Sequence, residues 1–117
     1  MIAIMLFSSS PFLEFSKSTR KINKRYKIND CKELLVLEAV LGAYSDGVEF
    51  SVLDLILLGD IASQATLHSI MKTLILKKMI KTETCKRDAR RKYVLPTKQG
   101  LSWLKDKDEL LVASQNR

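Results

Sequence analysis

Hydrophobic positions recur at helical spacing over most of the chain. Ser10 followed by Pro11 is typical of a helix start, with serine as the N-cap and proline in the first turn. The residues that follow carry an apolar seam at alternating spacings of four and three, which predicts a helix with one narrow apolar face. The seam consists of Phe12, Phe15, Thr19, Ile22 and Tyr26. A seam this narrow fits one neighbouring helix, either of a second copy of the chain or of the chain's own domain.

The middle of the chain predicts three more helices. The first has an N-cap at residue 29 or 30 and a broad apolar face that includes Cys31, which we expect in the core. A short helix then starts from a capping-box pattern at Ser51, and we expect it to be heavily buried. Its apolar residues are Val52, Leu53, Leu55, Ile56 and Leu57. The third helix is predicted over residues 64–78, after the N-cap Ser63.

Beyond Ile80 the apolar pattern changes to alternation, which predicts two strands, Lys81–Cys85 and Arg91–Leu95, joined by a basic tip. Thr97 then caps a last helix, in which Trp103 lies off the leucine stripe and is better explained by packing or dimer formation than by ligand stacking. The predicted fold class is α+β, mainly α with a small β-hairpin wing: a winged helix-turn-helix flanked by N- and C-terminal helices. We expect an N-terminal basic arm over 1–28, the winged-helix domain over 29–97, and a C-terminal helix and tail over 98–117.

Charge is strongly segregated along the 117 residues, whose net charge is +7. Residues 63–98 contain ten basic and two acidic side chains, whereas residues 29–62 contain one basic and seven acidic ones. A basic segment that coincides with a helix and a hairpin is typical of a nucleic-acid footprint, although basic runs are often simply solvated faces. The two cysteines are too few and too far apart for a disulfide scaffold, which favours a reducing, cytoplasmic location.

Short polar side chains near the start of the third predicted helix can reach base edges in a major groove, while backbone N–H groups meet phosphate. The candidates there are Ser63, Gln64, Thr66, His68, Ser69 and Lys72. The hairpin tip can contact a minor groove or the DNA backbone, because the negative potential there favours arginine. The candidates there are Lys86, Arg87, Arg90, Arg91 and Lys92.

Several of these residues together resemble the MarR family of winged-helix transcription regulators. The likeness rests on Thr66-Leu67-His68 with the later Leu74 and Met79-Ile80, on Asp88-Ala89-Arg90 in the wing, and on Thr97 with Gly100. It implies that Arg90 is the wing arginine and that Asp88 is the structural partner that holds the tip. Lys78 stands where the family usually has glycine, and Pro96 where it usually has leucine. The chain is also shorter than typical members, so a small-molecule effector is possible but not supported.

The sequence offers little support for catalytic, cofactor or metal sites. No phosphate-binding loop, dinucleotide fingerprint, zinc-protease or serine-hydrolase motif is present, and His68 is the only histidine, so we expect no enzyme activity, cofactor or metal site. Cys85, beside basic residues, could sense oxidants, but an ordinary structural thiol is favoured. The apolar residues 2–7 are too few to span a bilayer and lack a basic segment before them, so no membrane partner is expected.

The sequence therefore predicts a transcriptional regulator that binds specific double-stranded DNA, acts as a repressor and forms a homodimer. The seam defined above is the candidate dimer interface. The alternative is a winged-helix adaptor that binds another protein, or a non-specific nucleic-acid-binding protein.

Overall fold

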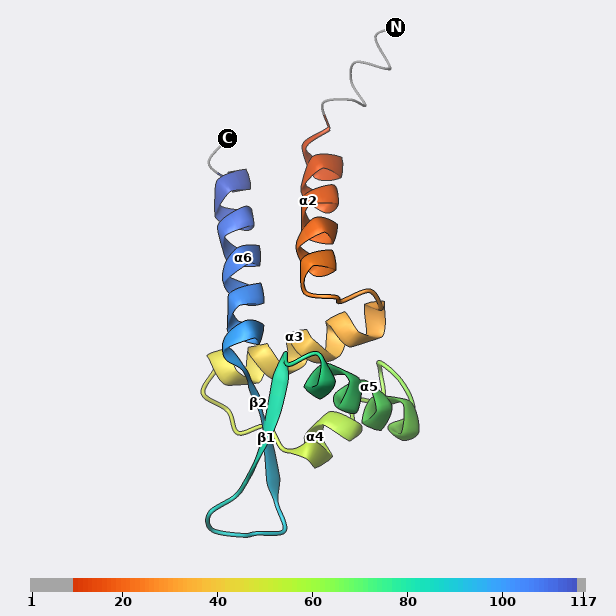
Figure 1. Ribbon diagram of the computed structural model, residues 1–117, viewed down its shortest axis with the longest axis vertical. Helices are drawn as coiled ribbons and strands as arrows, with labels where there is room; N and C mark the ends of the chain where they lie inside the picture. Colours follow the sequence, from red (N-terminus) through yellow and green to blue (C-terminus); the bar gives the residue numbers. More distant parts are fainter. Residues whose placement is uncertain (1–9, 116–117) are drawn as a thin grey trace, which may run out of the picture.

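The computed structural model describes residues 10–115, and Figure 1 shows their arrangement. The elements in chain order are α2 (Pro11–Arg25), α3 (Cys31–Ser45), α4 (Val52–Ile56), α5 (Gln64–Leu76), β1 (Ile80–Thr84), β2 (Lys92–Pro96) and α6 (Lys98–Gln115). The apolar residues 2–7 discussed above lie outside the described residues. Within the described part of the chain, no helix is long and apolar enough to cross a membrane.

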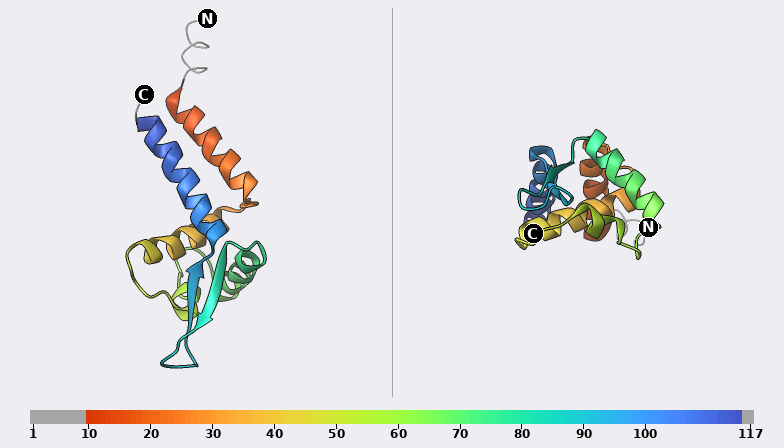
Figure 2. Two further views of the ribbon diagram at one scale, coloured as in Figure 1. Left: turned by 60° about the vertical axis from the view of Figure 1, so that its left-hand side comes forward. Right: turned by 90° about the horizontal axis from the view of Figure 1, so that it is seen from below.

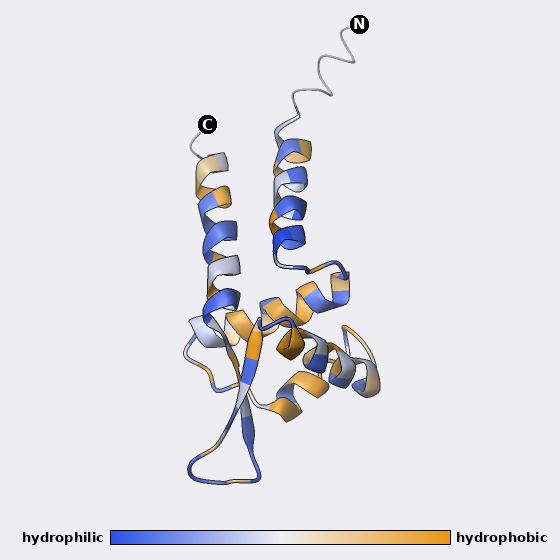
Figure 3. Cartoon of the chain, in the orientation of Figure 1, coloured by the Kyte–Doolittle hydropathy of each residue, from blue (hydrophilic) through white to orange (hydrophobic). Residues whose placement is uncertain are grey.

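The core lies where α3 crosses α5, β2 and the start of α6. Figure 3 shows the difference in hydropathy: α3 and α4 are largely apolar, whereas α2 and the hairpin are largely hydrophilic. The largest side chains with almost no exposure are Val36, Leu37, Val40, Leu55, Leu67, Leu74, Met79, Ile80 and Val94. Gly100 allows α6 to start close against this core, because a Cβ at that position would collide with the backbone oxygen of Met79.

Helices α2 and α6 pair with opposite directions and project together away from the hairpin (Figures 1 and 2). We call this pair the two-helix arm. Ile22 is buried between the arm and the core, the Tyr26 hydroxyl donates to Asp106 Oδ2 at 2.7 Å, and the Trp103 indole N–H donates to Asn23 Oδ1 at 3.0 Å. Trp103 is thus a packing residue, because α6 packs on α2 as well as on the core.

Strands β1 and β2 form an antiparallel hairpin in which Ile80 pairs with Pro96 and Thr84 with Lys92. Each strand is displaced by one residue from its predicted range. β2 is also held on its other side, because Ser51 forms an isolated bridge with Tyr93 and the Val94 N–H donates to the Phe50 carbonyl at 2.7 Å. The base of the wing is therefore fixed between β1 and the segment that precedes α4.

Helix α5 ends two residues earlier than the predicted limit of 78. Lys77 is its C-cap, and Lys78 has a left-handed backbone with φ of 61°. The Met79 N–H donates to the Leu74 carbonyl and the Lys78 N–H to the Ile75 carbonyl, which together form a Schellman motif. Glycine usually occupies the left-handed position of this motif. Lys78 therefore adopts the left-handed conformation that ends the helix, although this conformation is less favourable for lysine than for glycine.

Two expectations about burial are wrong. Cys31 is exposed rather than in the core, because it is the first residue of α3 and lies beyond the helices that cover the rest of its apolar face. Helix α4 is not heavily buried: Leu55 is buried, but Leu53 is 60% and Leu57 55% exposed. Because α4 is short, it turns only one side toward α5, and its remaining apolar residues face outward.

Candidate nucleic-acid interface

Helix α5 separates its polar and apolar residues cleanly. Leu67, Ile70, Met71 and Leu74 are buried against the core. The predicted contact residues Ser63, Gln64, Thr66, His68, Ser69 and Lys72 are all exposed. The structure thus places all six on the outward side of one helix.

The start of α5 is ordered by its own side chains. Ser63 Oγ accepts the Thr66 N–H at 3.3 Å and donates to Thr66 Oγ1 at 3.0 Å. This N-cap satisfies one of the free N–H groups at the helix start and leaves the positive end of the helix dipole at the surface. Gln64 and His68 have no such local bond, so their side chains remain free for a partner.

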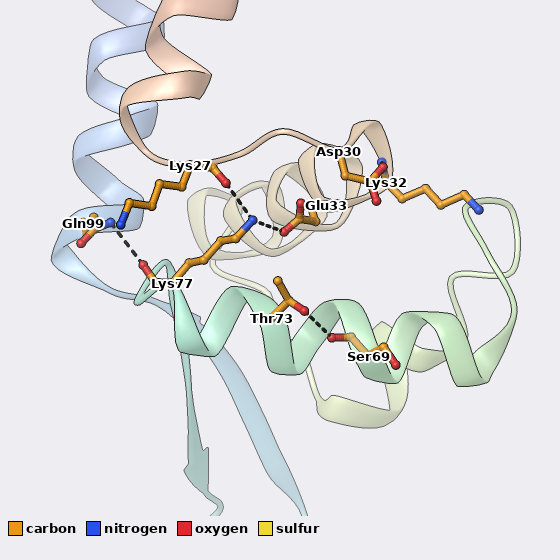
Figure 4. Close-up of polar contacts among 8 residues, drawn as sticks. All are labelled: Lys27, Asp30, Lys32, Glu33, Ser69, Thr73, Lys77 and Gln99. Atoms are coloured by element: carbon orange, nitrogen blue, oxygen red, sulfur yellow. Dashed lines mark hydrogen bonds and ion pairs between the residues drawn. The ribbon is translucent and has the colours of Figure 1, made fainter.

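The other end of α5 is fixed by one lysine. Lys77 Nζ lies 2.5 Å from Glu33 Oε1 in the first turn of α3, and it also donates to the Lys27 carbonyl at 2.7 Å (Figure 4). The Lys77 carbonyl in turn accepts from the Gln99 side chain at 3.2 Å. The end of α5 is therefore joined to the link between α2 and α3 and to the start of α6. The sequence analysis missed this connection, because residues 33 and 77 are separated by 44 positions and by no recognisable motif.

Asp88 lies in the wing tip and accepts hydrogen bonds from the two arginines that follow it. Asp88 Oδ1 accepts the backbone N–H of Arg90 at 3.0 Å and its Nε–H at 3.3 Å, and the Asp88 carbonyl accepts the Arg91 N–H. The Arg90 side chain is 93% exposed, so this contact directs it without covering it.

The remaining basic side chains of the wing are also exposed. Arg87 lies 3.3 Å from Glu49 Oε1, and the Arg91 guanidinium lies 6.0 Å from the centre of the Tyr93 ring. Lys86 is exposed in the tip and Lys92 at the start of β2. Glu49 is the acidic group that offsets part of the wing's charge, and it comes from the link before α4.

Cys85 lies beneath these side chains and is buried. The Tyr93 hydroxyl, the backbone N–H groups of Arg87 and Asp88, and the Arg87 side chain together hold the pKa of the Cys85 thiol below its ordinary value. The pKa of Tyr93 is raised, first by its hydrogen bond with Cys85 and second by its hydrogen bond with Glu49.

The interface candidates gather at one end of the molecule. In Figures 1 and 2 the wing, α4 and α5 lie at the end opposite the two-helix arm. Helix α5, with its exposed polar residues, and the basic wing therefore belong to the same end of the molecule. Among the described residues there is no group of three or more histidine, cysteine, aspartate or glutamate side chains placed to hold a metal ion.

The candidate dimer residues divide into two groups. Ile22 is buried and Tyr26 is bonded to Asp106, so both are used within the arm of the same chain. Phe12 is 72% exposed, and Phe15 and Thr19 are half-buried. The outer turns of the seam therefore remain available to a partner, whereas its inner turns pack on α6.

No protein-family model and no curated protein matches the chain. Solved structures do match. The S. aureus MepR–DNA complex has a TM-score of 0.74 at 16% identity, over 88% of this chain and 73% of that one. MepR bound to ethidium bromide gives 0.65 at 15% identity, over 90% and 75%. The transcriptional regulator Tm0710 from Thermotoga maritima gives 0.61 at 14% identity, over 99% and 75%.

At these identities the likeness establishes the fold. The chain shares the winged helix-turn-helix fold of these solved structures, with a helical arm and a hairpin wing, and the predicted fold class is confirmed.

Proposed function

We propose that the protein is a non-enzymatic transcriptional regulator that binds double-stranded DNA through α5 and the wing. The observation that carries this proposal is that α5, with its N-cap Ser63 and five exposed polar residues, lies at the same end of the molecule as the basic wing. The likeness to MepR, which has been solved as a complex with DNA, supports DNA as the partner.

Each part of the surface has a physical role in this proposal. Gln64 and His68 lie in the first two turns of α5, where a helix inserted in a major groove meets base edges. Lys72 lies one turn later and reaches phosphate. Arg90, directed by Asp88, enters a minor groove or contacts the backbone beside it. Phosphate contacts supply affinity and salt dependence, whereas base contacts supply specificity.

The arm supports a homodimer. Its outer turns carry apolar side chains that the described residues leave uncovered: Phe12, Leu13, Leu111 and Val112 are between 46% and 72% exposed. Two helices cannot bury both of their faces against each other, and a second arm would complete a four-helix packing unit. A dimer places two α5 helices on one duplex, and such a protein represses transcription by blocking access to a promoter.

The test is selection of bound duplexes from a randomised pool at physiological salt, followed by sequencing. Enrichment of an inverted repeat, with half-sites about one helical turn apart, is the expected result. The selected sequence is then titrated with Gln64→Ala and His68→Ala, which should lose more affinity for the selected duplex than for a random one. Lys105→Ala, an exposed lysine on α6, is the matched control. Binding without any enrichment contradicts sequence recognition, and absence of binding favours a protein-binding adaptor.

A further inference from the structure

Helix α2 carries a second concentration of positive charge that the proposed interface does not use. Five basic residues recur at spacings of three, one, three and one, so they lie on one side of the helix. We call this set the basic stripe: Lys17, Arg20, Lys21, Lys24 and Arg25. All five are exposed, and none forms an ion pair within the described residues. Glu14 is the only acidic residue of α2.

The opposite side of α2 is already occupied. Ile22 is buried, Asn23 accepts the indole N–H of Trp103, Tyr26 bonds to Asp106, and the Thr19 carbonyl accepts from Lys107 Nζ at 3.1 Å. These contacts fix the rotation of α2 about its own axis. The basic stripe must therefore face away from α6, whatever partner the arm meets through its outer turns.

Acidic side chains lie near the stripe without forming salt bridges to it. Lys21 and Arg25 line a shallow hollow together with Asp106 and Glu109 of α6. Arg20 and Lys24 line another hollow with Asp30. Arg20 also donates a hydrogen bond to Ser16 Oγ at 2.8 Å, but this neutral hydroxyl does not neutralise its charge. Within the described residues, all five charges of the stripe therefore remain unpaired.

We propose that the basic stripe binds the phosphate backbone of a second segment of duplex DNA, so that the protein can bridge two segments. The stripe extends over nine residues, about 12 Å of helix, which matches about three to four phosphates of one strand along the duplex axis. The two-helix arm projects away from α5 and the wing (Figure 1), so the stripe and the proposed interface lie in different parts of the molecule. The bridging arrangement rests on the proposed function, whereas contact between the stripe and a duplex does not.

A lipid surface is the other polyanion that a basic helix can meet. Helices that bind at a membrane surface insert their apolar face into the headgroup region. In α2 that face is covered by α6 over its inner turns, and its insertion would break the contacts of Ile22, Tyr26 and Trp103. Backbone phosphates need only the charged side, so the structure favours duplex DNA.

The experiment measures capture of a labelled random duplex by a second duplex fixed on beads in the presence of full-length protein. The stripe variant is Lys17→Gln/Arg20→Gln/Lys24→Gln. The control Lys32→Gln/Lys98→Gln/Lys105→Gln removes the same charge from exposed positions elsewhere, and thermal melting checks that both remain folded. The stripe variant should lose at least ten-fold in capture, while the control matches wild type. Its affinity for a single selected duplex should change less than three-fold.

A second measurement separates this proposal from the proposed function. In a Gln64→Ala/Arg90→Ala background, binding to a random duplex is titrated against salt. Adding the stripe substitutions should reduce the slope of log affinity against log salt by about 2 to 3, because each lost phosphate contact contributes about 0.9. An unchanged slope, or equal loss of capture by stripe variant and control, overturns the proposal. Loss of binding to phosphatidylserine vesicles without any effect on duplex capture overturns it in favour of a lipid surface. A pool selection that enriches nothing refutes only the proposed function.

Discussion

Lys77 and Glu33 form an ion pair, Nζ to Oε1 2.5 Å, between the end of α5 and the first turn of α3. The Glu33 side chain is 8% exposed and that of Lys77 23%, so solvent screens the pair only in part. The same lysine donates to the Lys27 carbonyl. The position of the candidate recognition helix thus depends on a contact with the segment that follows α2.

Removing one partner of this pair should be costly. We expect Lys77→Ala to lower the free energy of unfolding by about 2–3 kcal/mol, because it leaves the Glu33 carboxylate buried without its cation. Lys77→Met/Glu33→Gln should recover part of that loss. The exposed pair Lys81–Glu83 is the control, and Lys81→Ala should cost about 0.5 kcal/mol or less. Urea unfolding measures all of these variants, and equal effects at residues 77 and 81 would contradict the assigned role.

A substitution at Lys78 should increase the stability of the protein instead of lowering it. Its φ of 61° is unfavourable for a residue with a Cβ, so Lys78→Gly should raise the free energy of unfolding by about 0.5–1 kcal/mol. Leu76, which is 82% exposed in the last turn of α5, is the matched control. Leu76→Gly should lower stability by about 1 kcal/mol, because glycine is unfavourable inside a helix. A loss of stability in both variants would refute the left-handed conformation at residue 78.

Asp88 provides a test in which charge and geometry predict opposite outcomes. By charge alone, Asp88→Ala should strengthen DNA binding, because it removes a negative group from the wing. We expect instead a three- to ten-fold weaker affinity for the selected duplex, because Asp88 directs Arg90 through both its backbone and its side chain. Glu49→Ala is the contrast: it releases Arg87, and affinity should rise. Fluorescence anisotropy titration at fixed salt measures both, and tighter binding by Asp88→Ala would exclude a positioning role.

Alkylation of the Cys85 thiol should depend on pH with a shifted midpoint. In a Cys31→Ser background, alkylation of Cys85 should increase with pH around a midpoint below the ordinary thiol value, because the Tyr93 hydroxyl and nearby N–H groups stabilise the thiolate. Tyr93→Phe removes the largest of these causes and should move the midpoint upward. Tyr26→Phe, which alters a hydroxyl on the arm, should leave the midpoint unchanged. Mass spectrometry of samples quenched across the pH range gives the profile.

The helices and the wing were predictable because their signals are local. Ser10-Pro11, the capping box at Ser51, and the change to alternation after Ile80 each act within a few residues, and each element appears close to its expected range. The bond from Asp88 to Arg90 is equally local. The exposed polar residues of α5 could be predicted from the sequence because helical spacing alone decides which side is polar.

Burial was less predictable because it depends on what covers each face. Cys31 continues an apolar face in sequence, but no element extends over the start of α3. Leu53 and Leu57 belong to an apolar run, yet a short helix packs on one side only. The bonds of Lys77 to Glu33 and of Trp103 to Asn23 join residues 44 and 80 positions apart, and no single-sequence pattern identifies them.

The pairing of α2 with α6 also has a consequence for the order of folding. The hairpin, the capping box at Ser51 and the contact of α4 with α5 require only short loops to close, whereas the arm must bring together segments about 80 residues apart. The entropic cost of loop closure increases with loop length, and non-local contacts slow folding. We therefore expect the winged-helix core to form first and the arm to close last. In such a pathway the two-helix arm, which carries the proposed dimer surface, is completed only after α5 and the wing have reached their positions.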